Sequence, residues 1–117
     1  MGRAMKLTPE ILAKVYDRLA KSPPFSGWEM PPRELMVFKI TKNKKRRGYF
    51  RYLCDAVVIS ISEKYNTTRR QVEATMAHEM IHAHLEMVSP DGPHHGHEFQ
   101  ACADLVCERL RFRRRGF

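Results

Sequence analysis

The 117-residue sequence predicts an α+β fold in which a small sheet of about three strands, antiparallel or mixed, packs on helices. Three observations lead to this prediction. One window near the N-terminus repeats apolar residues at helical spacing, a capping box opens a longer helical window after residue 68, and β-prone segments lie between them. A third amphipathic window follows near the C-terminus. The length suits one domain over residues 1–117, with a basic tail over 109–117.

The first helix is expected over residues 9–21. Thr8 carries the hydroxyl that an N-cap needs, and Pro9 suits the first helical position. The next stretch, SPPFSGWEMPP over residues 22–32, is rich in proline and glycine and therefore predicts a loop. We expect Trp28 in this loop to pack on the core rather than to bind a ligand.

The strands are expected between residues 35 and 62. Residues 35–41 and 49–53 are β-prone and flank the basic run KNKKRRG, which predicts a hairpin with a charged tip. Residues 57–62, VVISIS, alternate with the period of two that is typical of a strand. We expect at least two of the three aromatic residues of the second segment to pack into the core: Tyr49, Phe50 and Tyr52.

Two further helices are expected after the strands. Thr68 and Gln71 match the capping box, so a helix should begin at Arg69 and run to about Val88. The stretch SPDGP then ends it. A final helix should run from near His95 to about Arg111, with an apolar stripe formed by Phe99, Cys102, Ala103, Val106 and Leu110.

The net charge of +8 is distributed unevenly along the chain. Basic residues cluster over 42–51 and in the tail, whereas residues 71–108 contain seven acids and neither lysine nor arginine. The basic runs favour a polyanionic partner, with nucleic acid the leading candidate. The acidic, histidine-rich middle favours a cation.

Neither a membrane span nor a disulfide framework is expected. No stretch approaches the roughly 18 consecutive apolar residues of a membrane helix. The three cysteines contain no CxxC pair, which indicates free thiols. We expect a monomeric protein in a reducing intracellular compartment, either the cytoplasm or the nucleoid or nucleus.

The motif that carries chemistry is HExxH, from His78 to His82. Residues four apart lie on the same face of a helix, so both imidazoles can reach one metal ion at zinc–nitrogen distances of about 2.0–2.1 Å. Glu79 lies beside His78, where its carboxylate can reach a water on the metal and act as a general base. The spacing therefore predicts a catalytic metal site.

A third protein ligand is needed, and the residues leave several candidates. They are two carboxylates and the three histidines of the stretch DGPHHGHEF: Glu98, Asp104, His94, His95 and His97. His95 lies one turn before Phe99 on the apolar stripe of the last helix and is therefore the first candidate for the third ligand. His94 is the second candidate and His97 the third. We expect His84 to be a solvated surface residue.

These residues resemble the SprT-like zinc metallopeptidases. The resemblance rests on ATMAHEMIHAHL, the short loop that follows it and HGHEF, with a weaker upstream similarity in GYFRYLCDAVVISIS. In that family the histidine before the glycine is the third zinc ligand, which is His95 here. The resemblance covers roughly residues 35–110 and implies a minimal zincin-like domain with an HExxH helix and a C-terminal helix.

The resemblance implies a peptide-bond hydrolase with Zn²⁺ on His78, His82 and His95, and with Glu79 as the catalytic residue. Members of the Spartan type also bind DNA and degrade proteins crosslinked to it. The implied partners are a protein substrate and DNA, single-stranded or at junctions. The candidates for DNA contact lie in the basic run and the tail: Lys44, Lys45, Arg46, Arg47, Arg113, Arg114 and Arg115.

Two further expectations concern how the site is used. The substrate should lie extended along residues 57–61, because pairing with an edge strand binds backbone without demanding a sequence. A second class of function stays open, a nucleic-acid-binding module with a structural zinc and little or no peptidase activity. Glu79 favours the peptidase, because a structural site has no use for an acid beside an open coordination position.

Overall fold

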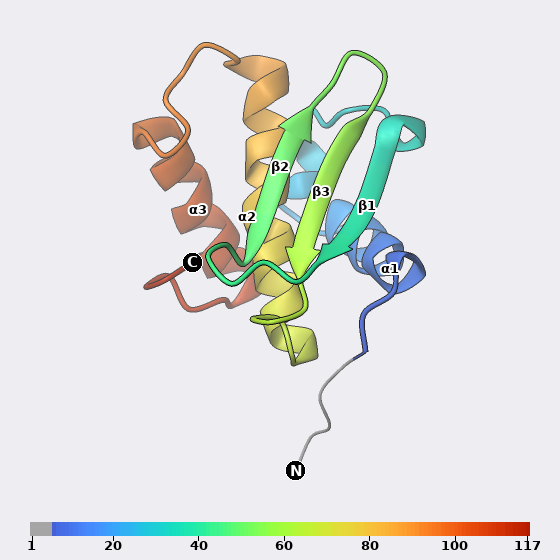
Figure 1. The fold of residues 1–117 in the computed structure, drawn as a ribbon. Helices are drawn as coiled ribbons and strands as arrows, with labels where there is room; N and C mark the ends of the chain where they lie inside the picture. Colours follow the sequence, from blue (N-terminus) through green and yellow to red (C-terminus); the bar gives the residue numbers. More distant parts are fainter. Residues whose placement is uncertain (1–5) are drawn as a thin grey trace.

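The computed structural model describes residues 6–117, so the first five residues of the expected domain lie outside the described part. Within that part, three α-helices and a mixed three-stranded sheet confirm the predicted α+β fold (Figure 1). The helices are α1 (Pro9–Ala20), α2 (Arg69–Val88) and α3 (His97–Leu110). The strands are β1 (Met36–Thr41), β2 (Gly48–Tyr52) and β3 (Val57–Ser62), and two short 3₁₀ helices precede them, Phe25–Gly27 and Arg33–Leu35.

Both of the first two α-helices begin where the sequence predicts. The Thr8 hydroxyl accepts a hydrogen bond from the Ile11 backbone N–H at 3.1 Å. At the start of α2, the Thr68 hydroxyl accepts from the Gln71 N–H at 3.2 Å, while the Gln71 side chain accepts from the Thr68 N–H at 3.1 Å. This reciprocal cap satisfies N–H groups that a helix leaves without partners. It therefore fixes the start of the helix that carries HExxH.

The sheet order is β1-β3-β2, so the predicted hairpin of residues 35–41 and 49–53 is wrong. β1 pairs with β3 in parallel, and β2 pairs with β3 in antiparallel orientation. Five of the six residues of β3 are buried, and burial on both faces is what a central position provides. The basic loop crosses the end of β3 instead of closing a hairpin, since the Ser62 N–H donates to the Arg47 carbonyl oxygen at 2.8 Å.

The central position of β3 also overturns the expected substrate placement. Both edges of Val57–Ser62 are already hydrogen-bonded to neighbouring strands, so no third chain can pair there. The outer edge of β2 has no strand partner within residues 6–117. Within the described residues, only the outer strands β1 and β2 leave an edge at which a further strand could pair.

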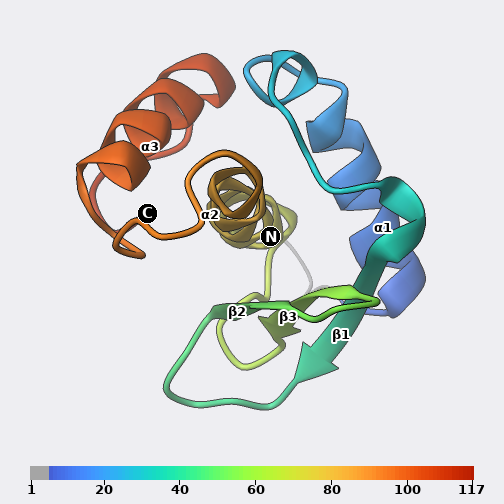
Figure 2. The ribbon, with the colours of Figure 1, turned by 90° about the horizontal axis from the view of Figure 1, so that it is seen from above.

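Helix α2 lies at the centre of the molecule, between α1 and α3 and against one face of the sheet (Figure 2). Val72, Met76, Met80 and Ile81 of α2 are inaccessible to solvent. Because neighbours enclose this helix on several sides, its apolar residues are not confined to one stripe. The HExxH residues are therefore held by a helix that the rest of the fold surrounds.

The aromatic residues divide between the core and the surface. Trp28 is half-buried and packs against the core, as predicted. Tyr49 and Tyr52 are 43% and 48% exposed, so the expectation that two of the three β2 aromatics are in the core is wrong. Of the three, only Phe50 packs against the core. Tyr49 lies on the opposite face of β2, whereas Tyr52 shares the face of Phe50 but is the last residue of the strand. Among the described residues, no helix combines the length and apolarity that a bilayer crossing requires.

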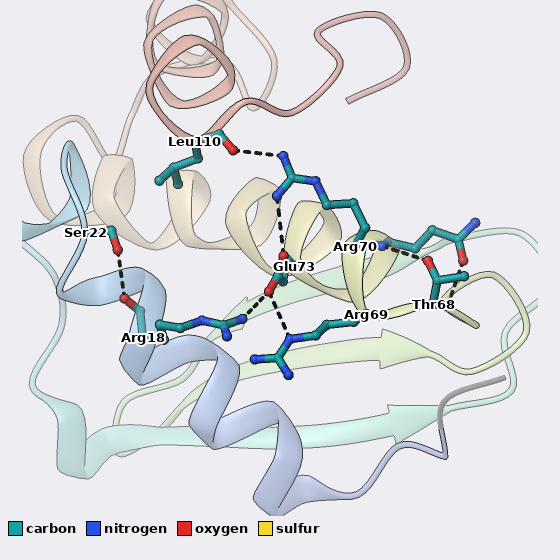
Figure 3. Close-up of polar contacts among 8 residues, drawn as sticks. Arg18, Ser22, Thr68, Arg69, Arg70, Glu73 and Leu110 are labelled. Carbon is teal, nitrogen blue, oxygen red and sulfur yellow. Dashed lines mark hydrogen bonds and ion pairs between the residues drawn. The ribbon is translucent and has the colours of Figure 1, made fainter. Parts of the chain in front are cut away.

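An ion cluster around Glu73 joins the three helices (Figure 3). The Glu73 carboxylate contacts Arg18 of α1, Arg69 at 3.3 Å and Arg70 at 3.4 Å. Arg70 also donates to the Leu110 carbonyl oxygen at the end of α3, at 2.9 Å. The Glu73 side chain is 14% exposed, whereas the three arginine side chains are 46–63% exposed and stay in contact with solvent. The cluster thereby ties α1 and α3 to the first turns of α2.

Candidate metal centre

Helix α2 presents His78 and His82 one turn apart, toward a cleft that Glu79 also lines. Both histidines are half-buried, and Glu79 is 6% exposed. The ring centroids of His78 and His82 are 5.2 Å apart. The helical spacing read from the sequence therefore brings the two rings together.

His95 supplies the third imidazole of the group. Its Nε2 lies 3.2 Å from the His82 Nε2 and 3.3 Å from the His78 Nε2. Helix α3 begins at His97, with Gly96 as an extended N-cap, so His95 lies in the preceding turn and not on the helix face that favoured it in the sequence. The exposed turn nevertheless directs its ring at the other two.

The three nitrogens fit a metal ion. Four ligands at about 2.0–2.1 Å in a tetrahedron lie roughly 3.3 Å from one another, which is close to the 3.2 and 3.3 Å found here. One ligand atom from each histidine lies within 4.8 Å of the others. Three imidazoles leave one tetrahedral position free, as in catalytic zinc sites. The group could therefore hold a metal ion with room for a reactant.

Two phenylalanines orient these rings. Phe99 is the last residue of the HGHEF stretch, but its contacts with the three rings do not follow from that motif, and Phe117 belongs to no motif. The Phe99 ring centroid lies 4.8 Å from that of His78 and 4.7 Å from those of His82 and His95. The Phe117 carbonyl oxygen lies 3.1 Å from the His78 Nδ1, an arrangement in which Nδ1 donates and Nε2 is left free for a metal. The sequence predicts only a core position for Phe99, whereas the role of Phe117 depends on a backbone atom.

Burial sets the protonation of the group. It lowers the pKa of His78 to about 4 and that of His82 to about 3, with further lowering by the neighbouring imidazoles. Both rings are therefore neutral at pH 7, the form that binds a metal. Burial raises the pKa of Glu79 to about 8, against a lowering by the charge of Arg46. The metal-free site thus holds Glu79 close to its titration point near neutral pH.

The other sequence candidates lie outside the three-histidine group. The Glu98 carboxylate accepts from the Ser89 hydroxyl at 2.8 Å, and the Asp104 carboxylate pairs with Arg114 at 2.6 Å. His94 lines the cleft, with its ring 5.8 Å from that of His82, and His97 is exposed. Among residues 6–117, the only group of such side chains that could hold a metal ion consists of His78, His82 and His95.

His84 is not the solvated residue that the sequence predicts. Its ring stacks on Trp28 with the centroids 4.5 Å apart and the planes at 15°. Its Nδ1 lies 2.8 Å from the Glu29 carbonyl oxygen. The ring thereby fastens the proline-rich loop to α2, a structural task that depends on where that loop folds back.

The two basic runs meet at the mouth of the cleft, which has a volume of about 1150 Å³. Arg46 and Arg47 line it from the β1–β2 loop, and Arg113 and Arg115 line it from the tail. Arg114 instead donates to Asp104 and Gln100, and so fastens the tail to α3. The exposed Lys44 and Lys45 lie in the same loop. Glu79 is the only acid that lines the cleft within the described residues.

The α+β fold and the three-histidine group, with two of its members on an HExxH helix and the third in the turn before α3, together fit a zincin-like domain. A family model described as the SprT-like family matches residues 15–114. The chain therefore belongs to the SprT-like family, which is associated with metallopeptidase-like domains. No curated protein matches the chain.

Proposed function

We propose that this protein is a zinc-dependent metalloendopeptidase that acts on proteins associated with or crosslinked to DNA. The observation that carries the proposal is the convergence of the three Nε2 atoms beside a buried glutamate. Membership of the SprT-like family supports the same class of reaction.

The proposed zinc ligands are His78, His82 and His95. Imidazole accepts several transition metals, and three imidazoles in a tetrahedral arrangement are well suited to zinc. When bound, zinc supplies Lewis-acid chemistry that polarises a carbonyl oxygen. The Phe117 carbonyl and the Phe99 ring hold the imidazoles in place before the metal arrives, which reduces the reorganisation that binding requires.

Glu79 is the proposed general base. Its carboxylate would take a proton from the attacking water and pass it to the nitrogen of the leaving amine. Glu79 lines the same cleft as the three imidazoles and is 6% exposed, so its carboxylate lies within the site where the proton of the attacking water has to be taken up. The same burial excludes bulk water that would compete for the proton.

The proposed substrate path follows the outer edge of β2. Gly48, Tyr49 and Phe50 of this strand line the cleft, and Phe50 lies near His82, with the ring centroids 6.3 Å apart. A polypeptide that pairs with this edge forms main-chain hydrogen bonds with little demand on its sequence. Such a mode suits an enzyme that meets varied proteins.

DNA is the proposed partner that brings substrates to the site. The arginines at the cleft mouth form a basic rim, which we define as Arg46, Arg47, Arg113 and Arg115. Arginine side chains neutralise phosphates and thereby favour binding to single strands and duplexes alike. A protein attached to the bound DNA would then lie close to the cleft.

Glu79→Gln tests the peptidase proposal. Glu79 is not one of the three proposed histidine ligands, so the variant should still bind one zinc per chain. Because the general base is removed, its kcat on a DNA-bound protein should fall by about 10²-fold or more. Glu86→Gln on the same helix is the matched control, since Glu86 does not line the cleft, and it should cleave as the wild type does.

Wild-type protein with one bound zinc that cleaves neither itself nor a substrate protein, with or without single-stranded DNA, would contradict the peptidase. If this protein still binds DNA, the result would instead favour a nucleic-acid-binding module with a structural zinc.

A further inference from the structure

Strand β2 approaches α2 very closely at Gly48. A Cβ atom at this position would lie 2.7 Å from the Thr75 Cγ2, 2.9 Å from the Glu79 Oε2 and 3.2 Å from the Glu79 Cγ. Real Cβ atoms essentially never approach another heavy atom within 3.0 Å. The backbone of β2 therefore forms one wall against the Glu79 carboxylate, and only glycine fits that wall.

A buried amide connects β2 to α2 at the same place. Asn66, in the turn between β3 and α2, is 1% exposed. Its Nδ2 donates to the Arg47 carbonyl oxygen at 2.9 Å and to the Ser62 carbonyl oxygen at 2.7 Å. Its Oδ1 accepts from the Thr75 hydroxyl at 2.6 Å. All these groups are satisfied in a site from which water is excluded, which makes the arrangement specific.

The two ends of this connection flank the general base. Arg47 directly precedes Gly48 in the chain, and Thr75 lies one turn before Glu79 on the same face of α2. The Asn66 amide therefore holds both Arg47, the residue before Gly48, and Thr75, which lies one helical turn before Glu79. Any change in its length or hydrogen bonding changes the gap in which Glu79 lies.

We propose that Gly48, Asn66 and Thr75 form a positioning unit that sets the gap between β2 and Glu79. The unit holds the carboxylate in one orientation toward the reacting atoms, and it also sets the distance of the proposed substrate edge from that carboxylate. This inference rests on the proposed function, since Glu79 is its base. The three imidazoles are held by other contacts, those of Phe99 and Phe117.

The unit should act on turnover more than on metal binding. A displacement of about 1 Å in a reacting group can cost about 10²-fold in rate. Thr75→Val keeps the shape of the side chain and removes the hydroxyl, so kcat should fall by about tenfold or more, with one zinc per chain retained and KM changed by less than about twofold. Thr75→Ser keeps the hydroxyl and should recover most of the loss.

Gly48→Ala tests the wall itself. The added methyl should lower kcat by about 10²-fold. The double variant Gly48→Ala/Thr75→Ser lacks the Thr75 methyl that lies 2.7 Å away, so it should regain part of the activity. A role in folding alone would leave the kcat of the folded, zinc-loaded Gly48→Ala protein at the wild-type value. If Gly48→Ala does not fold, the Thr75 pair still decides the outcome.

A measurement without catalysis separates this inference from the proposed function. In zinc-free protein, nuclear Overhauser contacts between the Gly48 Hα and the Glu79 side chain should be present in the wild type and Thr75→Ser, and weakened in Thr75→Val. Unchanged contacts and wild-type kcat in Thr75→Val would overturn the inference, as would a loss of zinc that accounts for the whole fall in activity. If the wild type cleaves nothing, the proposed function fails, and these contacts alone decide whether the unit positions Glu79.

Discussion

The three histidines converge because each ring is held by contacts beyond the motif that predicts it. Phe99 touches all three rings, so one apolar side chain restricts the whole group. The Phe117 carbonyl adds a polar contact to His78 alone. Outer contacts of this kind fix the tautomer and the ring orientation of a ligand. The site is therefore prepared for a metal by residues that cannot bind one.

The neighbouring histidines His94 and His95 offer a direct test. His95→Ala should lower zinc affinity by more than the 10–100-fold that is typical when a residue supporting a ligand is removed. His94→Ala should lower it by less than about tenfold, because His94 is not part of the three-nitrogen group. Titration against a competing chelator measures both. If His94→Ala loses the metal and His95→Ala retains it, the assignment of His95 as the third ligand is refuted.

The sequence predicts some of these residues and not others for a physical reason. His78, Glu79 and His82 follow from helical spacing, which is local. His95 follows in the sequence from a position on a helix face, and the structure places it in a turn instead. Gly48 and Phe117 act through a missing Cβ atom and a backbone carbonyl, so side-chain chemistry gives no signal for them.

Helix α2 illustrates what enclosure does to the groups on one element. Packing between α1, α3 and the sheet removes water from the HExxH residues (Figure 2). Desolvation disfavours the charged form of each group, which lowers the pKa of both histidines and raises that of Glu79. Burial thus favours neutral imidazoles and, in the zinc-free protein, the neutral form of the Glu79 carboxyl group, whereas a cation on the three histidines would favour the carboxylate.

This enclosure predicts how the stability of the zinc-free protein depends on pH. Glu79 has a pKa of about 8 in the folded protein and 4.5 as its ordinary value, so its contribution to stability is present below pH 4.5 and is lost as the pH rises through 8. His78 and His82 have lowered pKa values, so their contributions to the free energy of unfolding change with pH only below about pH 6.5. Between pH 6.5 and 8, the free energy of unfolding should therefore fall by up to about 1.4 kcal/mol per pH unit.

Urea denaturation of zinc-free wild type and Glu79→Gln measures this effect. The variant carries no ionisable group at this position, so its free energy of unfolding should lack the decline. Equal slopes in the two proteins between pH 6.5 and 8 would show that Glu79 does not titrate as its burial requires.

Element boundaries were easier to predict than element partners. The caps at Thr8 and Thr68 are local signals, and both helices begin there. Strand pairing depends on residues far apart, and the basic run between two β-prone segments suggested a hairpin where the chain instead crosses the end of β3. The run of apolar residues in β3 was the available signal for a central strand.

At the scale of the whole molecule, the fold gathers charge from distant parts of the chain. The β1–β2 loop and the tail meet where Arg47 donates to the Gly116 carbonyl oxygen at 2.5 Å. The basic rim therefore surrounds the same cleft that holds the three histidines. The charge runs were visible in the sequence, but their position around one opening required the fold.

The basic rim predicts salt-dependent DNA binding. Changing Arg113 and Arg115 together to glutamine should weaken binding to single-stranded DNA and reduce the slope of log affinity against log salt by about 0.7 for each phosphate that the protein no longer neutralises. Lys14 in α1 and Lys21 directly after it, on the other side of α2 from the tail (Figure 2), supply a control of equal charge. Fluorescence anisotropy over a series of salt concentrations measures the affinity and its salt dependence. An affinity that does not fall as the salt concentration rises would refute DNA binding through the basic rim.

The sheet order has a consequence for how the chain folds. Val57 pairs with Tyr52 on one side and with Met36 on the other. The Tyr52–Val57 pair closes a short turn, in which the Leu53 N–H donates to the Ala56 carbonyl oxygen at 2.8 Å. The Met36–Val57 pair closes a longer loop, which contains the rest of β1, the β1–β2 loop and β2. Closing a longer loop costs more chain entropy and is slower. During refolding, β2 and β3 should therefore pair before β1 joins them, so the strand wall beside Glu79 forms early and the far edge of the sheet is completed last.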